Sequence, residues 1–157
     1  MSVRYEVDPL VVMNDDGKGL LDDVEKVYST SEAARFFDMS NQWLYWGMRN
    51  NVFTYLDGTP IQPERIGKGG RRRFTLPIIR EIALSCHRRG NLKQEGLWEA
   101  STGRGKGKVS VKALDEDAAV EVFVQKHGKE PERVTYTPGL RDVLMKVARA
   151  ERGEMVV

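Results

Sequence analysis

The sequence contains little cysteine and histidine and no long apolar run, and each shortage excludes a class of protein. Its 157 residues include one cysteine, Cys86, and two histidines, His87 and His127. A single cysteine excludes an intrachain disulfide and a multi-cysteine zinc site, and two distant histidines form no histidine-rich metal site. No stretch approaches the ~20 consecutive apolar residues of a membrane helix, and the first residues lack the order of a secretory signal. We therefore expect a cytoplasmic protein without a metal site, a cofactor or a membrane partner.

The residue types that enzymes use for catalysis are also not grouped in the sequence. No paired carboxylates, metal-ligand spacing or nucleophile–base set stands out. The Gly67-Lys-Gly-Gly70 stretch lacks the spacing of a nucleotide-binding loop and its following serine or threonine. Cys86 lies on the apolar face of an expected helix, so we interpret it as a small buried apolar residue rather than a nucleophile. The sequence thus predicts no catalytic residues and a protein that is not an enzyme.

What the sequence does have is positive charge concentrated in one segment. The net charge of the chain is only +2, yet residues 65–108 carry twelve basic and three acidic side chains, a net charge of +9. The net charge is −4 for residues 1–26, −2 for residues 27–64 and −1 for residues 109–157. Such a cluster indicates a polyanionic partner, because each phosphate that is neutralised releases counterions. A solvated basic face with no partner is the alternative interpretation.

Composition divides the chain into four parts. Residues 1–26 form an acidic, weakly structured lead-in, residues 27–100 form the main block, and residues 101–110 have the glycine, lysine and arginine content of a linker. The C-terminal region, residues 111–157, is expected to be helical. Its last helix is amphipathic and has to bury its apolar face, so we expect residues 115–152 to support a homodimer or cooperative multimer, or to bind a partner protein.

The main block begins with two short helices whose ends are marked in the sequence. Ser29-Thr-Ser-Glu32 has the spacing of a capping box, and Ser40 is a second capping residue. Leu44, Met48 and Val52 follow at intervals of four and form one apolar stripe. Two capped helices separated by a short turn predict a helix-turn-helix.

A basic β-hairpin and a third helix are predicted next. Arg65–Ile66 and Arg71–Thr75 have the character of two strands around the glycine-rich tip 67–70. Side chains alternate along a strand, so Phe74 is expected in the core while Arg71 and Arg73 face outward. Thr75 then caps a helix whose apolar residues recur at helical spacing, namely Ile79, Ile82, Ala83 and Cys86.

Residues 27–90 resemble the winged helix-turn-helix domains of MerR-type regulators and excisionase-like proteins. The resemblance is carried by Tyr28-Ser-Thr-Ser-Glu-Ala-Ala, Met39-Ser40, the Trp43-Leu-Tyr-Trp helix and the Gly70-Arg-Arg-Arg-Phe-Thr wing. The segment Val52–Glu64 departs from the pattern, because it is longer than the usual link between recognition helix and wing. The resemblance implies a mainly α fold with a small β-wing: a winged helix-turn-helix domain with a C-terminal helical extension.

The resemblance also implies a function. The implied protein is a transcription regulator that binds double-stranded DNA in a sequence-specific manner and is nucleoid-associated when bound. Its recognition helix, residues 40–51, would lie in the major groove, and its wing, residues 65–75, would lie on the backbone or in the minor groove. An excisionase-like architectural factor that bends DNA for a recombinase, or a protein-interaction module, are the alternatives. Polar and planar side chains of a helix reach base edges in the major groove. The residues expected to contact DNA are Ser40, Asn41, Gln42, Tyr45, Trp46 and Arg49 on the helix and Arg65, Lys68, Arg71, Arg72 and Arg73 on the wing.

Overall fold

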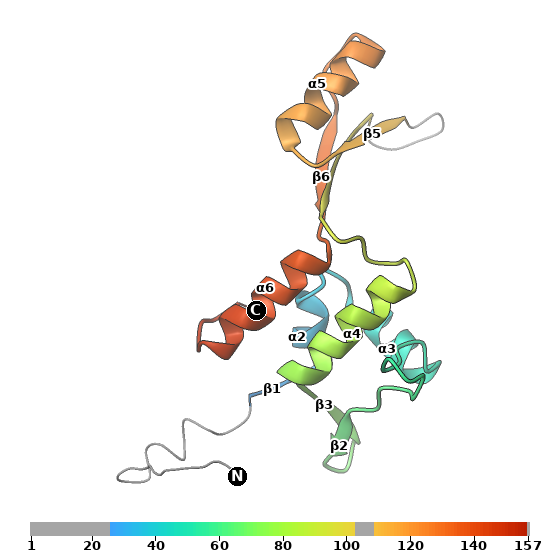
Figure 1. The fold of residues 1–157 in the computed structure, drawn as a ribbon, viewed down its shortest axis with the longest axis vertical. Helices are drawn as coiled ribbons and strands as arrows, with labels where there is room; N and C mark the ends of the chain where they lie inside the picture. Colours follow the sequence, from blue (N-terminus) through green and yellow to red (C-terminus); the bar gives the residue numbers. More distant parts are fainter. Residues whose placement is uncertain (1–25, 103–108, 157) are drawn as a thin grey trace.

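The structure is a mixed α and β fold. The computed structural model describes residues 26–102 and 109–156, and all of the expected lead-in except Lys26, together with most of the expected linker, lies outside these ranges. Of the described residues, 42% are helical and 21% lie in strands, arranged as five helices and two three-stranded antiparallel sheets (Figure 1). The expectation of a mainly α fold with a small wing is therefore wrong.

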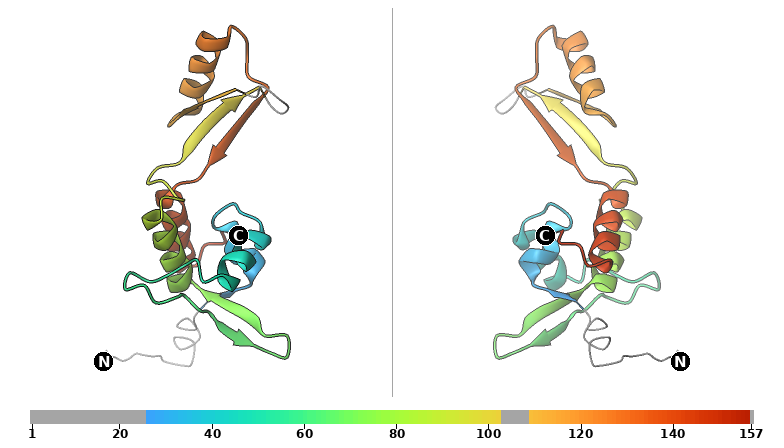
Figure 2. Two further views of the ribbon diagram at one scale, coloured as in Figure 1. Left: turned by 90° about the vertical axis from the view of Figure 1, so that its right-hand side faces the viewer. Right: turned by 90° about the vertical axis from the view of Figure 1, so that its left-hand side faces the viewer.

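The elements fall into two units, one inserted into the other. The first unit contains β1 to α4 and also α6, whereas β4, β5, α5 and β6 form a second unit between α4 and α6 (Figures 1 and 2). In chain order the elements are β1 (Val27–Tyr28), α2 (Thr30–Arg35), α3 (Asn41–Arg49), β2 (Glu64–Ile66), β3 (Arg71–Thr75), α4 (Leu76–Arg88), β4 (Leu97–Ser101), β5 (Ser110–Ala113), α5 (Glu116–His127), β6 (Arg133–Thr137) and α6 (Leu140–Glu151).

The helix starts of the first unit follow the capping residues that the sequence shows. The Ser29 hydroxyl accepts the Glu32 amide at 3.1 Å while the Glu32 carboxylate accepts the Ser29 amide at 2.9 Å, which confirms the capping box before α2. Ser40 accepts the Trp43 amide and caps α3, and Thr75 accepts the Ile78 amide and caps α4. Each cap satisfies a backbone N–H that the helix itself leaves without a partner.

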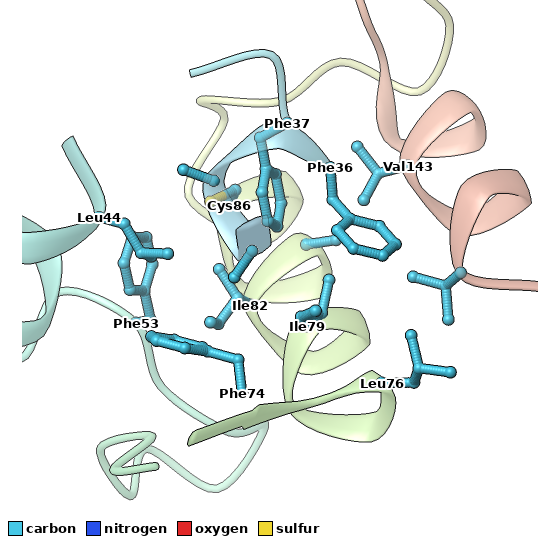
Figure 3. Close-up of a cluster of buried hydrophobic side chains, with 14 of the residues drawn as sticks. Phe36, Phe37, Leu44, Phe53, Phe74, Leu76, Ile79, Ile82, Cys86 and Val143 are labelled. Atoms are coloured by element: carbon cyan, nitrogen blue, oxygen red, sulfur yellow. The ribbon is translucent and has the colours of Figure 1, made fainter. Parts of the chain in front are cut away.

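The core of the first unit lies against α4 (Figure 3). Phe36 and Phe74, from α2's C-terminal end and from β3, are both fully buried, as the sequence predicts for Phe74. The predicted apolar face of α4 is confirmed by the burial of Ile79, Ile82, Ala83 and Cys86. Val143 and Val147 of α6 belong to the same core. The core of the first unit therefore contains residues that precede the second unit in the sequence and residues that follow it.

Helix α6 is consequently not part of a helical extension. It packs along α4, and its buried residues Val143, Val147 and Ala150 are covered by the first unit. Lys26 donates to the carbonyl of Ala150 at 2.9 Å, which fixes the far end of the helix to the chain before β1. The expected C-terminal helical extension is wrong for two reasons: strands precede α6, and α6 buries its apolar face within its own chain.

The second unit is a three-stranded antiparallel sheet with one helix. The strand order is β5-β4-β6, and α5 packs on one face of the sheet. Its small separate core consists of Ala100, Val111, Ala119 and Phe123, and Phe123 is fully buried. Asp115 caps α5 by accepting the amides of Asp117 and Ala118. Among the described residues of this core, Phe123 is thus the one large side chain that is fully buried.

Two chain segments that cross in close contact connect the units. The amides of Leu140 and Arg141 donate to the carbonyls of Lys93 and Gln94 at 2.7 and 3.1 Å. Tyr136 donates its hydroxyl proton to Asp142 at 2.6 Å. That hydrogen bond is the main reason why the pKa of Tyr136 is raised to about 12. We call this crossing, formed by residues 93–96 and 136–141, the neck.

The segment between α3 and β2 forms a hairpin that is fixed to α4. The Ile61 amide donates to the Phe53 carbonyl at 2.9 Å, and both side chains are buried. Thr54 donates its amide to Ser85 at 3.0 Å and accepts Arg88 at 2.7 Å. The tip, by contrast, exposes Leu56 to 82%. The extra length of Val52–Glu64 is thus a second projecting hairpin, fixed to α4, which we call hairpin 53–61.

Candidate nucleic-acid interface

Helix α3 presents one polar and aromatic face to the exterior. Gln42 and Arg49 are exposed, and Tyr45 and Trp46 are 39% and 53% exposed. The opposite face buries Leu44 and Met48 in the core, as their spacing predicts. The inserted unit lies at the other end of the long molecule and leaves α3 uncovered (Figures 1 and 2).

Two of the expected α3 contact residues are engaged in structural hydrogen bonds. Asn41 is half-buried and donates to the Ser31 hydroxyl at 3.3 Å, and Ser40 caps the helix. Trp43 is the aromatic residue that belongs to the core, because its ring contacts Phe37 and Phe53 at centroid distances of 5.2 and 5.4 Å. Gln42, Tyr45, Trp46 and Arg49 therefore remain the accessible side chains of the helix.

The wing is formed by β2 and β3, and β1 extends it to a three-stranded sheet. Its tip turns at residues 67–70, where the Gly70 amide donates to the Gly67 carbonyl at 3.1 Å. Gly67 and Gly70 have φ angles of +75° and +62°, a conformation that glycine adopts without strain. Lys68 is exposed at this tip.

The two sides of β3 differ in their electrostatic environment. Arg73 lies opposite Glu64 in the sheet register and pairs with it at 3.3 Å, so its charge is partly compensated. Arg72 lies on the same side of the strand as the buried Phe74 and faces α3. Arg71 is exposed. Arg72, which the sequence ranks behind Arg71 and Arg73, is thus the one directed towards α3.

A groove of about 470 Å³ lies between the wing and the two helices of the helix-turn-helix. It brings together Tyr45 of α3 with Arg65 and Arg72 of the wing. Gly69, Gly70 and Arg71 form its second edge. Its third side is Ser29, Thr30 and Ser31. Sequence reasoning missed this last group, although the capping box at the same residues marks the start of α2.

Arg72 is the electrostatic centre of this groove. Its Nε is buried and has no hydrogen-bond partner within the described residues. Burial lowers the pKa of Arg72, and the positive charges of Arg65 and Arg49 lower it further, whereas Tyr45 opposes them. Carboxylates pair with Arg73 in the described part of the chain, but none pairs with Arg72, Arg65 or Arg49. The guanidinium groups of Arg65 and Arg72 thus meet in the groove, the charge of Arg49 acts on Arg72 from nearby, and no carboxylate of the described residues pairs with any of the three.

The comparison with known families covers the first unit apart from α6. A family model described as a domain of unknown function, DUF7229, matches residues 20–102, more than half of the chain. The chain belongs to this family. The DUF7229 match spans β1 to β4, including the wing and the groove, and ends before α5 and α6.

The comparisons assign no activity to the DUF7229 region. No curated protein and no solved structure matches the chain, and nothing found links DUF7229 to MerR-type or excisionase-like proteins. Among the described helices, none combines the length and apolar character needed to cross a bilayer. A proposal about function therefore depends on the geometry of the groove and of α3.

Proposed function

We propose that this chain binds double-stranded DNA in a sequence-specific manner, as a transcription regulator, through one surface that consists of α3, the wing and the groove between them. The observation that carries the proposal is the unpaired guanidinium cluster of Arg49, Arg65 and Arg72 beside the exposed face of α3. A backbone phosphate in the groove supplies the missing anion and accepts charge-assisted hydrogen bonds from arginine.

The remaining exposed side chains of α3 suit base recognition. Gln42 near the helix start has the amide geometry that pairs with an adenine edge, and Arg49 near the helix end pairs with guanine or a phosphate. Trp46 offers an exposed ring beside them. Because Gln42 and Arg49 are seven residues apart, they lie about two turns apart on the same face of α3. In this arrangement the groove fixes the position of the duplex backbone, and α3 supplies the sequence discrimination.

Substitution of Arg72 by alanine is expected to weaken duplex binding by about 10-fold or more, because a hydrogen bond to a charged group contributes roughly 1.5–3 kcal/mol. The slope of log affinity against log salt should decrease by about 1, the value of one lost phosphate contact. Fluorescence anisotropy with a short labelled duplex, repeated over a series of salt concentrations, measures both quantities.

Two variants serve as controls for this measurement. Arg73→Ala removes an arginine that Glu64 already compensates and should have a smaller effect. Arg141→Ala removes the same charge at the start of α6, where Arg141 pairs with Glu95 at 3.6 Å, and should leave affinity unchanged. Equal effects of Arg72→Ala and Arg141→Ala would show that only net charge matters and would contradict the proposed surface. Selection of bound duplexes from a random pool then identifies the sequence, if one is preferred.

An architectural role is the second candidate, and hairpin 53–61 is the observation that favours it. Its tip exposes Leu56 and Tyr55 on a base that hydrogen bonds fix to α4. Apolar side chains inserted between base steps unstack them and bend the duplex.

If this role holds, Leu56→Ser should reduce DNA bending while affinity changes less. Energy transfer between dyes at the two ends of a bound duplex measures the bend. Leu114→Ser is the matched control, because Leu114 is 68% exposed on the second unit, away from α3. An unbent duplex with the wild-type protein would exclude the architectural role and leave the regulator.

A further inference from the structure

A second cavity, distinct from the groove, lies where the first unit meets the end of β6. Its volume is about 310 Å³, at the lower end of the range for small-molecule pockets. Trp43 and Trp46 of α3 form one wall, and Val52 and Phe53 lie beside them. Leu92, which precedes the neck, and Pro138, which belongs to it, contribute further apolar surface. The cavity is thus lined by residues of the helix-turn-helix and of the junction between the units.

The thiol of Cys86, the hydroxyl group of Tyr136 and the carboxylate of Asp38 are not the groups that determine the ligand of this cavity. Burial raises the pKa of Cys86 to about 11, so its thiol is neutral and acts as apolar surface. The hydroxyl group of Tyr136 is engaged with Asp142, so Tyr136 offers mainly its ring. Asp38 is also at the cavity, and Lys146 pairs with it at 3.6 Å.

Arg89 is the charged group that remains. It lies at the end of α4 and is exposed, and one of its Nη atoms donates to the Val52 carbonyl at 3.4 Å. No carboxylate pairs with it among the residues that the structure describes. A guanidinium has five N–H donors, so the single bond to Val52 leaves donors available at the rim of the cavity.

We propose that this cavity binds a small aromatic carboxylate, with its ring against Trp43, Trp46 and Pro138 and its carboxylate on Arg89. Flat apolar walls accept a ring by stacking and edge contacts, and a planar guanidinium matches a carboxylate in a two-pronged hydrogen bond. The volume limits the ligand to about one or two rings. The cavity shares no lining residue with the groove that contains Arg72, whereas Trp46 belongs both to the cavity and to the exposed face of α3.

The experiment compares two probes of the same shape, 2-naphthoate and the neutral 2-naphthylmethanol, with the full chain. Calorimetric titration should show 2-naphthoate binding more tightly. Arg89→Leu should weaken the affinity for 2-naphthoate by about 10-fold or more and leave the affinity for the neutral probe unchanged, because only the charge-assisted contact is lost. Arg88→Leu is the matched control: Arg88 is the preceding arginine, bonds to the Thr54 carbonyl and does not line the cavity.

A measurement without substitutions locates the ligand. The three tryptophans give three indole N–H signals in a ¹⁵N-labelled sample, and Trp98 belongs to the second unit and serves as an internal reference. Bound 2-naphthoate should shift the signals of Trp43 and Trp46, which line the cavity, more than that of Trp98, which does not line it and whose ring contacts Tyr136 at its edge. The proposal is overturned if neither probe binds at millimolar concentration, if the neutral probe binds as tightly as the acid, or if Trp98 shifts instead.

Discussion

Truncation of Phe123 to alanine is expected to unfold the second unit while the first unit stays folded. Phe123 is the one large, fully buried side chain of the core formed with Ala100, Val111 and Ala119. Removal of a buried phenylalanine side chain costs about 3–5 kcal/mol. A unit this small buries a low fraction of its surface and has little stability in reserve, so the loss exceeds what the remaining alanine and valine contacts supply.

Hydrogen–deuterium exchange followed peptide by peptide checks this outcome. Amides of residues 97–137 should exchange rapidly in Phe123→Ala, whereas those of α4 should keep their protection, because α4 packs in a separate core. Val122→Ala is the control on the same helix: Val122 is 38% exposed, and its loss should change stability by only about 0.5 kcal/mol. Loss of protection in α4 together with residues 97–137 would show that the two units fold as one.

Substitution of Gly139 by alanine should destabilise the neck by about 3 kcal/mol. A Cβ atom at this position would lie 2.4 Å from the carbonyl carbon of Glu95 and 2.6 Å from the amide nitrogen of Gly96. Both neighbours are backbone atoms, so no side-chain rotation relieves the clash. Overpacking of this kind costs about 1–3 kcal/mol. Separating the chains also weakens the hydrogen bonds from Leu140 and Arg141, each contributing roughly 0.5–1.5 kcal/mol.

The φ angle of Gly139 is −103°, a value that any residue adopts, so Gly139→Ala introduces no backbone strain. Its loss of stability therefore measures the close contact alone. Gly69→Ala is the control, because Gly69 also has no positive φ and no atom lies within 4 Å of its Cβ position. Chemical unfolding of both variants gives the free energy of unfolding of each, which is compared with that of the wild-type protein. If Gly139→Ala is as stable as Gly69→Ala, the two segments of the neck are not in close contact in solution.

The features that the sequence predicts correctly are local ones. Ser29, Ser40 and Thr75 cap the helices that their spacing indicates, because a capping hydrogen bond reaches only three residues along the chain. The alternation that buries Phe74 is equally local. By contrast, β4 pairs with β5 and with β6, and no short-range pattern specifies either partner. The sheet of the second unit was therefore missed, and the fold class with it.

The same distinction applies to the candidate sites. Alternation predicts that Arg72 faces away from Arg71 and Arg73, but only the tertiary packing shows that α3 lies on the Arg72 side. The apolar face of α6 is evident in the sequence, whereas its partner, α4, is not. The cavity beside Arg89 joins residues from Phe37 to Pro138, so the sequence offers no signal for it.

The insertion of residues 97–137 between α4 and α6 has a consequence for synthesis on the ribosome. With the exception of Leu92, every residue of the first core that precedes the insertion lies at or before Cys86 in the sequence. The remaining residues of that core follow the insertion, and the first of them is Leu140. A nascent chain therefore carries α4 with its α6-facing side uncovered until all of the second unit has emerged. The second unit is complete earlier, so it is expected to fold first, and the exposed side of α4 is where a chaperone would bind in the interval.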